Sequence, residues 1–324
     1  HPNSRDWTRS PASPWCGASS TTRWWCRLSS DTFRCGAAAR GRDDSLLGTA
    51  APAQQWLLVE NPGPWPRRAF EDSPVDPVAG RRIVARARAA RTRPLFIRRP
   101  GRRPSDEGTS RWAVVDAAAG TVGRHDGDLA RVAAAEWTTS EPLAEPLYLV
   151  CTHGRHDMCC AIAGRPVASA LADLRPLSTW ECSHLGGDRF AGNVVVLPWG
   201  LTYGFVDADD VSDIVSATDR GDVFLPLLRG RSTEGPAVQA ARITAMRSLD
   251  LTAIDALTFT WAENPEPGDW MVRFRLGATT VRVAVQQVRV PDQRATCAHS
   301  EPVAMREFRG GAVTVEEESS DDGP

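Results

Sequence analysis

Cysteine and histidine side chains gather in two short segments of the chain. Residues 151–160 read CTHGRHDMCC and carry three thiols, and residues 180–188 read WECSHLGGD and carry one thiol and one imidazole. Thiolate and imidazole are the donors that zinc ions and iron–sulfur clusters take in proteins. Such a grouping is typical of a metal site or a redox site.

The first segment lies between a predicted strand and a predicted helix. The apolar run at 146–150 predicts a strand that delivers Cys151 at its end, and Pro166 is expected at the first position of a helix that reaches about Leu174. Residues 152–158 then form a loop that can wrap around a cofactor. Backbone N–H groups and the dipole of the following helix stabilise thiolates at such a position.

Not every side chain of this segment is expected to be a ligand. Cys159 precedes Cys160 directly, so its side chain is expected to point away from the site and to pack as an ordinary thiol. His153 and His156 are expected nearer to solvent, where water or the backbone satisfies them. Cys297 stands alone in the sequence and is expected to be an isolated thiol.

The second segment follows a predicted strand at 178–182. Cys182 and His184 lie at its end, and the glycine pair 186–187 allows the backbone to approach a cofactor closely. Asp188 comes four residues after His184 across this turn, so the donor atoms of the two side chains can converge. Two thiolates, an imidazole and a fourth donor suit either tetrahedral zinc or a [2Fe–2S] cluster, and spacing alone does not choose between them.

The elements that position these segments predict an α/β fold. A first unit is expected to contain a strand, a helix, a second strand and a hairpin, and a second unit repeats this order and closes with a helix. The predicted ranges are strands at 56–60, 94–99, 111–116 and 121–125 with a helix at 76–92, then strands at 146–150, 178–182, 193–198 and 201–206 with helices at 166–174 and 209–218. The order in the second unit favours a thioredoxin-like half-wound sheet, preceded by the smaller related unit.

These elements predict a five-part organisation. Residues 1–48 are expected to be a disordered or wrongly framed leader, because their cysteines contain no CxxC pair. The first α/β unit is placed at 49–140 and the thioredoxin-like domain at 146–225. A C-terminal extension of one helix and one hairpin is placed at 231–310, and the acidic tail 311–324 is expected to be disordered.

Composition narrows the class of protein. The chain has 324 residues, 42% of them hydrophobic, and a net charge of −2, so a core can form and no strong field favours nucleic acid or membrane. No apolar run of about 18 residues and no secretory signal are visible. With clustered thiols, this predicts a cytoplasmic protein without nucleic-acid or membrane partners.

The segments CTHGRHDMCCAIAGRPVASAL and WECSHLGGDRFAGNVVVLPWGLTYG resemble the sucrase/ferredoxin-like family, a branch of the thioredoxin-like [2Fe–2S] ferredoxins. The resemblance extends more weakly to GTAAPAQQWLLVENPGPWP and LFIRRPG, and covers about residues 48–225. Members characterised as iron–sulfur proteins take two cysteines from a CxxxxxxxxC loop and two histidines spaced HxxxH near the glycine pair. By position, the resemblance implies Cys151, Cys160, His184 and Asp188 as ligands.

Asp188 stands where the two-histidine branch has its second histidine, and a carboxylate is a harder donor than imidazole. The fourth donor therefore stays open between Asp188 and Cys182, since strand alternation places Cys182 on the same face as His184. A labile or missing cluster is the third alternative.

The resemblance implies an electron carrier with a [2Fe–2S] cluster rather than a catalyst of a defined reaction, with a reductase and an acceptor protein as partners. No convincing pair of carboxylates supports the glycosidase that the family name suggests. Two alternatives stay open: a thioredoxin-like thiol–disulfide enzyme with Cys151, Cys159 or Cys160 as nucleophile, and a structural zinc module. The first lacks a CxxC motif, and the second is distinguished by metal analysis.

Overall fold

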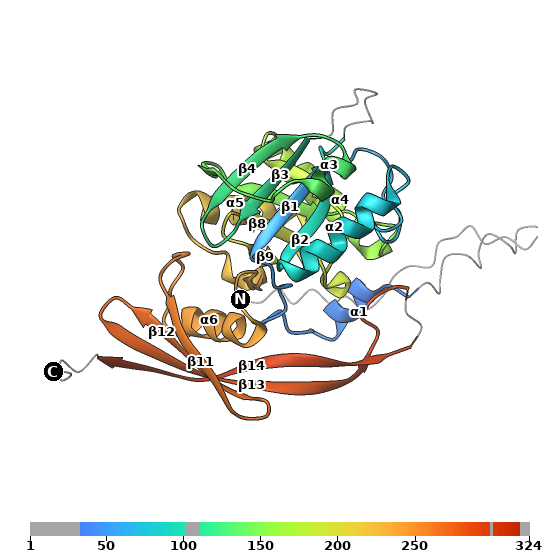
Figure 1. The fold of residues 1–324 in the computed structure, drawn as a ribbon. Coiled ribbons are helices and arrows are strands. Elements are labelled where there is room, and N and C mark those ends of the chain that lie inside the picture. The colour runs from blue at the N-terminus through green and yellow to red at the C-terminus, as the bar shows by residue number, and fades with distance from the viewer. Residues whose placement is uncertain (1–32, 102–110, 299–300, 318–324) are drawn as a thin grey trace, which may run out of the picture. The chain divides into compact units, whose positions relative to one another are not determined.

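The computed structural model describes residues 33–101, 111–298 and 301–317 (Figure 1). Contacts between Cα atoms divide the chain into residues 1–33 and 34–324, and all helices and strands named below belong to the second unit. The fold is mixed α/β, with a large sheet and a smaller one. No helix of the described ranges has both the length and the apolar character needed to cross a membrane.

The large sheet has ten strands in the order β10-β9-β8-β6-β7-β2-β1-β3-β4-β5. Their bounds are β1 Gln55–Glu60, β2 Thr92–Arg98, β3 Arg111–Asp116, β4 Thr121–Asp126, β5 Glu141–Pro142, β6 Leu147–Cys151, β7 Thr179–Cys182, β8 Val194–Leu197, β9 Leu201–Tyr203 and β10 Leu228–Arg231. The helices that accompany them are α2 Pro77–Ala89, α3 Leu129–Ala134, α4 Met158–Leu174 and α5 Val211–Asp219.

The two predicted α/β units share this one sheet. In the first, β1 pairs in parallel with β2 and antiparallel with β3, which pairs with β4; in the second, β6, β7, β8 and β9 repeat the pattern. The units join where β2 runs antiparallel to β7, with Ile97 opposite Cys182 and Arg98 opposite Glu181. The mixed α/β class is thus confirmed.

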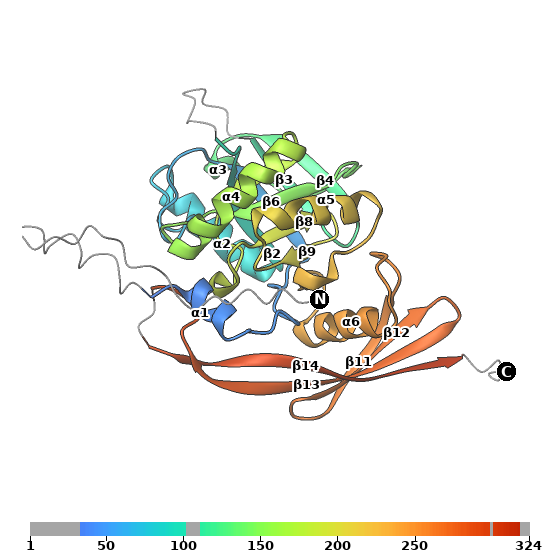
Figure 2. The ribbon, with the colours of Figure 1, turned by 180° about the vertical axis from the view of Figure 1, so that it is seen from behind.

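The sheet curls so that one of its faces lies inside. Trp56 and Leu58 of the first unit share a buried cluster with Leu149 and Val195 of the second, all from this inner face. The helices cover the outer face, α2 and α3 over the first unit (Figure 1) and α4 and α5 over the second (Figure 2). The ends of β6 and β7 lie side by side because the two strands pair in parallel, and the first turn of α4 follows β6 after a short loop at the same edge.

Helix α4 begins at Met158, eight residues before the expected start at Pro166. Asp157 caps it, because its carboxylate accepts a hydrogen bond from the backbone N–H of Cys159 at 2.9 Å. Pro166 lies inside the helix, where it removes one backbone donor without ending the helix. Cys159 and Cys160 therefore belong to the first helical turn and not to a loop.

The C-terminal region contains more strands than the expected helix and hairpin. Helix α6 (Pro236–Ser248) is followed by β11 (Thr258–Glu266), β12 (Asp269–Leu276), β13 (Thr279–Gln293) and β14 (Val303–Glu317), which pair in sequence as an antiparallel sheet. Helix α6 lies against this sheet (Figure 1), and its Ile243 and Met246 share a buried cluster with Val272 and Phe274 of the sheet. The outer strand β11 is largely exposed and mostly polar after Ala262, so the sequence pattern did not reveal it.

Two expectations of disorder do not hold for the described residues. Cys35–Gly41 form helix α1 with Cys35, Gly36 and Ala39 buried, although the leader was expected to be disordered up to residue 48. Of the expected acidic tail 311–324, residues up to Glu317 belong to β14. Residues 1–32 and 318–324 lie outside the described ranges.

Candidate metal centre

The strand ends place two thiols side by side. Cys151 ends β6 and Cys182 ends β7, and the two residues are partners in the parallel register. The backbone N–H of Thr152 donates to the carbonyl oxygen of Cys182 at 3.2 Å, which holds the chain together just beyond the strands. Both thiols are buried, so both belong to the inner core at this edge.

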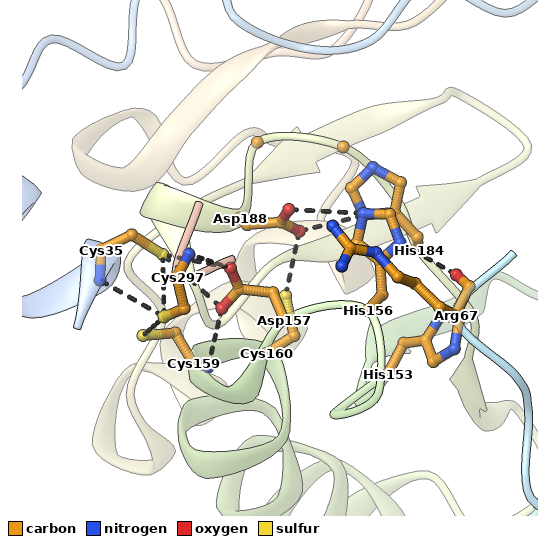
Figure 3. Close-up of polar contacts among 12 residues, drawn as sticks. Cys35, Arg67, His153, His156, Asp157, Cys159, Cys160, His184, Asp188 and Cys297 are labelled. Carbon is orange, nitrogen blue, oxygen red and sulfur yellow. Dashed lines mark hydrogen bonds and ion pairs between the residues drawn. The ribbon is translucent and has the colours of Figure 1, made fainter. Parts of the chain in front are cut away.

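The first turn of α4 directs neighbouring thiols to different places. Successive residues of an α-helix are turned by about 100° around its axis, so Cys159 and Cys160 do not face the same neighbour. The Sγ atom of Cys160 lies 3.3 Å from Oδ1 of Asp188, whereas that of Cys159 lies 3.3 Å from Sγ of Cys297 (Figure 3).

The glycine turn that carries His184 and Asp188 is fixed from behind. Gly186 and Gly187 have φ of 93° and 78°, which L-residues with side chains rarely adopt. Arg229 is fully buried and donates to the carbonyl oxygen of Gly186 at 3.0 Å and to Oδ1 of Asn193 at 2.6 Å. A side chain on Gly187 would collide with the guanidinium of Arg229. The positive φ angles and the contact with Arg229 therefore fix the backbone conformation of this turn.

Asp188 is the point on which this site converges. Its carboxylate lies 3.0 Å from Nδ1 of His184, 3.5 Å from Nε2 of His156 and 3.3 Å from Sγ of Cys160 (Figure 3). The predicted ligands Cys160, His184 and Asp188 are thus in direct contact. Cys151 shares a hydrogen bond between thiols with Cys160, so the fourth predicted ligand adjoins them.

Asp188 and the two imidazoles change one another's pKa values. Burial alone would raise the pKa of Asp188, but its close contacts with the imidazoles of His156 and His184 hold that pKa well below its usual range. The same carboxylate raises the pKa of His156, while burial lowers the pKa of His184. At neutral pH His184 is therefore a neutral imidazole with a free lone pair, as metal ligation requires.

The pKa values of the buried thiols also differ from one another. The hydrogen bond from Cys160 lowers the pKa of Cys151 and raises that of Cys160, so Cys151 is the better thiolate. Burial raises the pKa of Cys182 well above its ordinary value. Arg93 of β2 supplies positive charge toward Cys151, Cys182 and Asp188, and its guanidinium donates to the carbonyl oxygen of His184 at 3.2 Å.

Sequence reasoning missed two histidines and one arginine. His153 was expected near solvent, but only 2% of it is exposed, and its Nε2 lies 2.9 Å from the carbonyl oxygen of Pro66. His156 stacks on His184 with ring centroids 3.7 Å apart. The HGRH spacing beside Cys151 was the available signal for both; Arg93, from a distant strand, had none.

Cys159 points away from the site at Asp188, as expected, but neither it nor Cys297 is an ordinary isolated thiol. Cys297 is not isolated, because it lies with Cys35, Cys159 and Asp157 in a second group of donor atoms within 4.8 Å of one another. A backbone N–H of Gly36 donates to the sulfur of Cys159 at 3.4 Å. Hydrogen bonds from Cys35 and Gly36 lower the pKa of Cys159 to about 6.

A cleft of about 790 Å³ opens beside the histidines. Its lining is rich in arginine, with five arginines against two glutamates, and includes the imidazoles of the site. These residues are His153, His156, His184, Arg67, Arg68, Arg88, Arg91, Arg93, Glu71 and Glu234. The site is therefore reached from a surface on which positive charge predominates.

Comparison with known proteins gives one family. The sequence model of the sucrase/ferredoxin-like family matches residues 46–230, more than half of the chain. "Altered inheritance of mitochondria protein 32" of Meyerozyma guilliermondii is 32% identical over 95 residues, which is 26% of this chain and 34% of that protein. The protein of the same name from Candida glabrata is 31% identical over 96 residues, 25% of this chain and 31% of that protein. The chain thus spans about a third of the length of these relatives, and no solved structure matches it.

Proposed function

We propose that this chain, which belongs to the sucrase/ferredoxin-like family, is an electron-transfer protein with a [2Fe–2S] cluster. The chain gathers thiols and an imidazole at one edge of its sheet, as such a cluster requires. The observation that carries the proposal is the convergence of Cys160 and His184 on Asp188, with Cys151 adjoining. The strand order of the second unit is compatible with a thioredoxin-like ferredoxin domain.

The residues present fit such a cluster. Cys151 and Cys160 offer thiolates, and His184 offers a neutral imidazole. Nδ1 of His184 is buried and lacks a hydrogen bond of good geometry although Asp188 lies 3.0 Å away, so a donor atom is left without a proper partner. Asp188 would supply the fourth donor, with Cys182 as the alternative. A bound cluster would accept and release one electron at a time.

The surrounding residues would set the reduction potential of the cluster and give a partner protein access to it. The guanidinium of Arg93 would favour the reduced, more negative state, and so would His156, whose pKa is raised by the carboxylate of Asp188, whenever it is protonated. The arginine-rich cleft would receive an acidic face of a reductase or acceptor protein. Six free cysteines among the described residues suit a reducing compartment, and we place the protein in the cytoplasm.

An anaerobic absorption spectrum with iron and acid-labile sulfide analysis tests the proposal. We expect a brown protein with about two irons and two sulfides per chain, bleached by dithionite. Cys160→Ser should lose both iron and sulfide. Cys297→Ser is the matched control and should keep them, because Cys297 faces the other group of donors. A chain that stays colourless after anaerobic preparation would contradict the proposal.

A mononuclear metal site is a second candidate. The donor atoms of His156, His184 and Asp188 all lie within 4.8 Å of one another, and two histidines with one carboxylate are the ligands of non-haem Fe(II) sites. This candidate predicts one iron without sulfide, loss of metal in His156→Ala, and retention of metal in Cys160→Ser. The two proposals therefore give opposite results for the Cys160 variant.

The thiol–disulfide alternative rests on the contact between Cys151 and Cys160. His184→Ala separates it from a cluster, because loss of a ligand abolishes the cluster but barely changes thiol exchange. Turnover of a disulfide substrate that survives in His184→Ala and disappears in Cys151→Ser would favour the enzyme.

A further inference from the structure

Three thiols from distant parts of the chain meet beside the first turn of α4. Cys35 opens helix α1, Cys159 lies in α4, and Cys297 follows β13. The Sγ atoms of Cys159 and Cys297 are 3.3 Å apart, and those of Cys297 and Cys35 are 3.6 Å apart. Asp157 completes the group, with its carboxylate oxygens 3.5 and 3.6 Å from Sγ of Cys35 (Figure 3).

These separations are those of ligands around one ion. A disulfide requires sulfurs about 2.05 Å apart, and the three cysteines are free. Zinc–sulfur bonds of about 2.3 Å in a tetrahedron place neighbouring sulfurs about 3.8 Å apart. The observed sulfur–sulfur distances lie within half an ångström of that edge, so a small expansion would admit the ion. Three sulfurs around a single centre leave no room for a second iron between them.

The backbone is arranged to support negative charge on this group. N–H groups of Gly36 and Cys35 donate to the sulfurs of Cys159 and Cys297 at 3.4 and 3.5 Å. The N–H of Cys297 donates to Asp157 at 2.6 Å. Donors of this kind orient ligands and stabilise thiolates around a metal. Without a cation, up to three thiolates and a carboxylate would repel one another in a largely buried place.

We propose that Cys35, Cys159, Cys297 and Asp157 bind one zinc ion. A closed set of four protein ligands is typical of a structural zinc site. The ion would tie α1 and the segment around Cys297 to the start of α4. Cys159 would thus serve the zinc, while its neighbour Cys160 serves the site at Asp188. None of these four residues is a ligand of the proposed cluster, so zinc binding here does not depend on that cluster.

Zinc titration of the reduced, full-length protein tests this site. We expect one zinc per chain that a Cys160→Ser/His184→Ala variant still binds, because that variant disables only the site at Asp188. Cys297→Ser and Asp157→Asn, measured in the same background, should weaken zinc binding at least about tenfold. Cobalt in place of zinc should give an intense sulfur-to-metal charge-transfer band that Cys297→Ser reduces.

Alkylation mapped by mass spectrometry needs no variant and covers the case in which a substitution disturbs folding. Zinc should protect Cys35, Cys159 and Cys297 from a maleimide together, and its removal by a chelator should expose them together. Unchanged zinc affinity in Cys297→Ser, a Cys159–Cys297 disulfide in the protein as purified, or iron and sulfide that disappear with Cys297→Ser would each overturn the zinc proposal. Loss of iron in Cys160→Ser with retained zinc would support both the cluster proposal and the zinc proposal.

Discussion

At the scale of single residues, Asp188 is where the proposed cluster site would depart from the two-histidine pattern that the sequence resembles. Its carboxylate faces His156, His184 and Cys160 at once and is almost wholly buried. A buried carboxylate in that position adds negative charge where the two-histidine pattern has a neutral ring. Substitution of Asp188 is therefore the most direct test of the proposed ligand set.

The first prediction concerns Asp188→His. An imidazole removes one negative charge from the ligand set, so the reduction potential should rise by on the order of 100 mV while iron and sulfide are kept. Voltammetry of the anaerobic protein measures the shift. Asp188→Ala is the control and should lower the iron content instead. If Asp188→Ala kept its iron and the potential stayed constant in both variants, Asp188 would not be a ligand.

The second prediction concerns His153 in the metal-free protein. Burial lowers its pKa to about 4, while the unfolded chain has a value near 6.5, so the folded state resists protonation. The contribution of His153 is complete above pH 6.5 and is lost as the pH falls through 4, by about 3 kcal/mol. Urea unfolding of the wild type between pH 7 and 4 should show this loss.

His153→Gln is the matched variant, because glutamine can still donate to the carbonyl oxygen of Pro66 but does not titrate. Its stability should depend less on pH than that of the wild type over this range. Parallel stability curves for the two proteins would show that His153 is protonated equally in the folded and unfolded states.

At the scale of elements, the sequence predicted the main strands of the two α/β units and missed features that depend on distant contacts. The apolar runs ending at Cys151 and Cys182 are strands in the structure. The predicted start of α4 was wrong because Pro166 was interpreted as the first helical residue, whereas the helix begins at Met158 with Asp157 as its N-cap. The partnership of Cys159 with Cys297, 138 residues later, leaves no trace in local pattern.

The third prediction concerns the cap of α4. Asp157→Ala removes the acceptor for the N–H of Cys159 and should lower the free energy of unfolding by about 1 kcal/mol in the presence of a chelator. Asp157→Asn keeps an oxygen that accepts from the N–H of Cys159 but loses the acceptor for the N–H of Cys297, so it should lose less than Asp157→Ala without matching the wild type. Denaturant titration compares the two. Equal losses in both variants would attribute the effect to the charge of Asp157 and not to capping.

At the scale of the whole molecule, the two α/β units are joined by more than the short pairing of β2 with β7. Arg229 of β10 holds the glycine turn, and it also reaches Oγ1 of Thr49 at 3.1 Å, ahead of the first strand. Arg93 of the first unit donates to the turn from the other side. The candidate ligands lie in the second unit, but residues outside that unit hold their geometry. Spacing within the motif therefore predicted which candidate ligands come together, but it could not predict the distant residues that hold them in place.

The fourth prediction follows from this arrangement. Arg229→Met fills similar space but leaves the carbonyl oxygen of Gly186 and Oδ1 of Asn193 without their donor. Each of these two buried acceptors costs about 1–3 kcal/mol when it lacks a donor, so the free energy of unfolding should fall by about 2–6 kcal/mol. Iron content should fall with it, since the turn carries His184 and Asp188. Arg220→Met, on the exposed surface, is the control and should change neither quantity. Full iron loading in Arg229→Met would show that the turn keeps its shape without the arginine.

The fifth prediction extends the zinc proposal to the stability of the molecule. An ion that binds the folded chain alone stabilises it by about 2.7 kcal/mol at a free concentration one hundred times its dissociation constant. Because Cys35, Cys159 and Cys297 come from three separate segments, the gain should appear as slower hydrogen exchange in α1 and around residue 297. Thermal unfolding and hydrogen-exchange mass spectrometry, with and without zinc, measure both effects. Cys297→Ser should lose the zinc dependence and keep the fold, because Cys297 is partly exposed. If zinc raised the melting temperature of that variant as much as that of the wild type, the stabilising ion would be bound elsewhere in the chain.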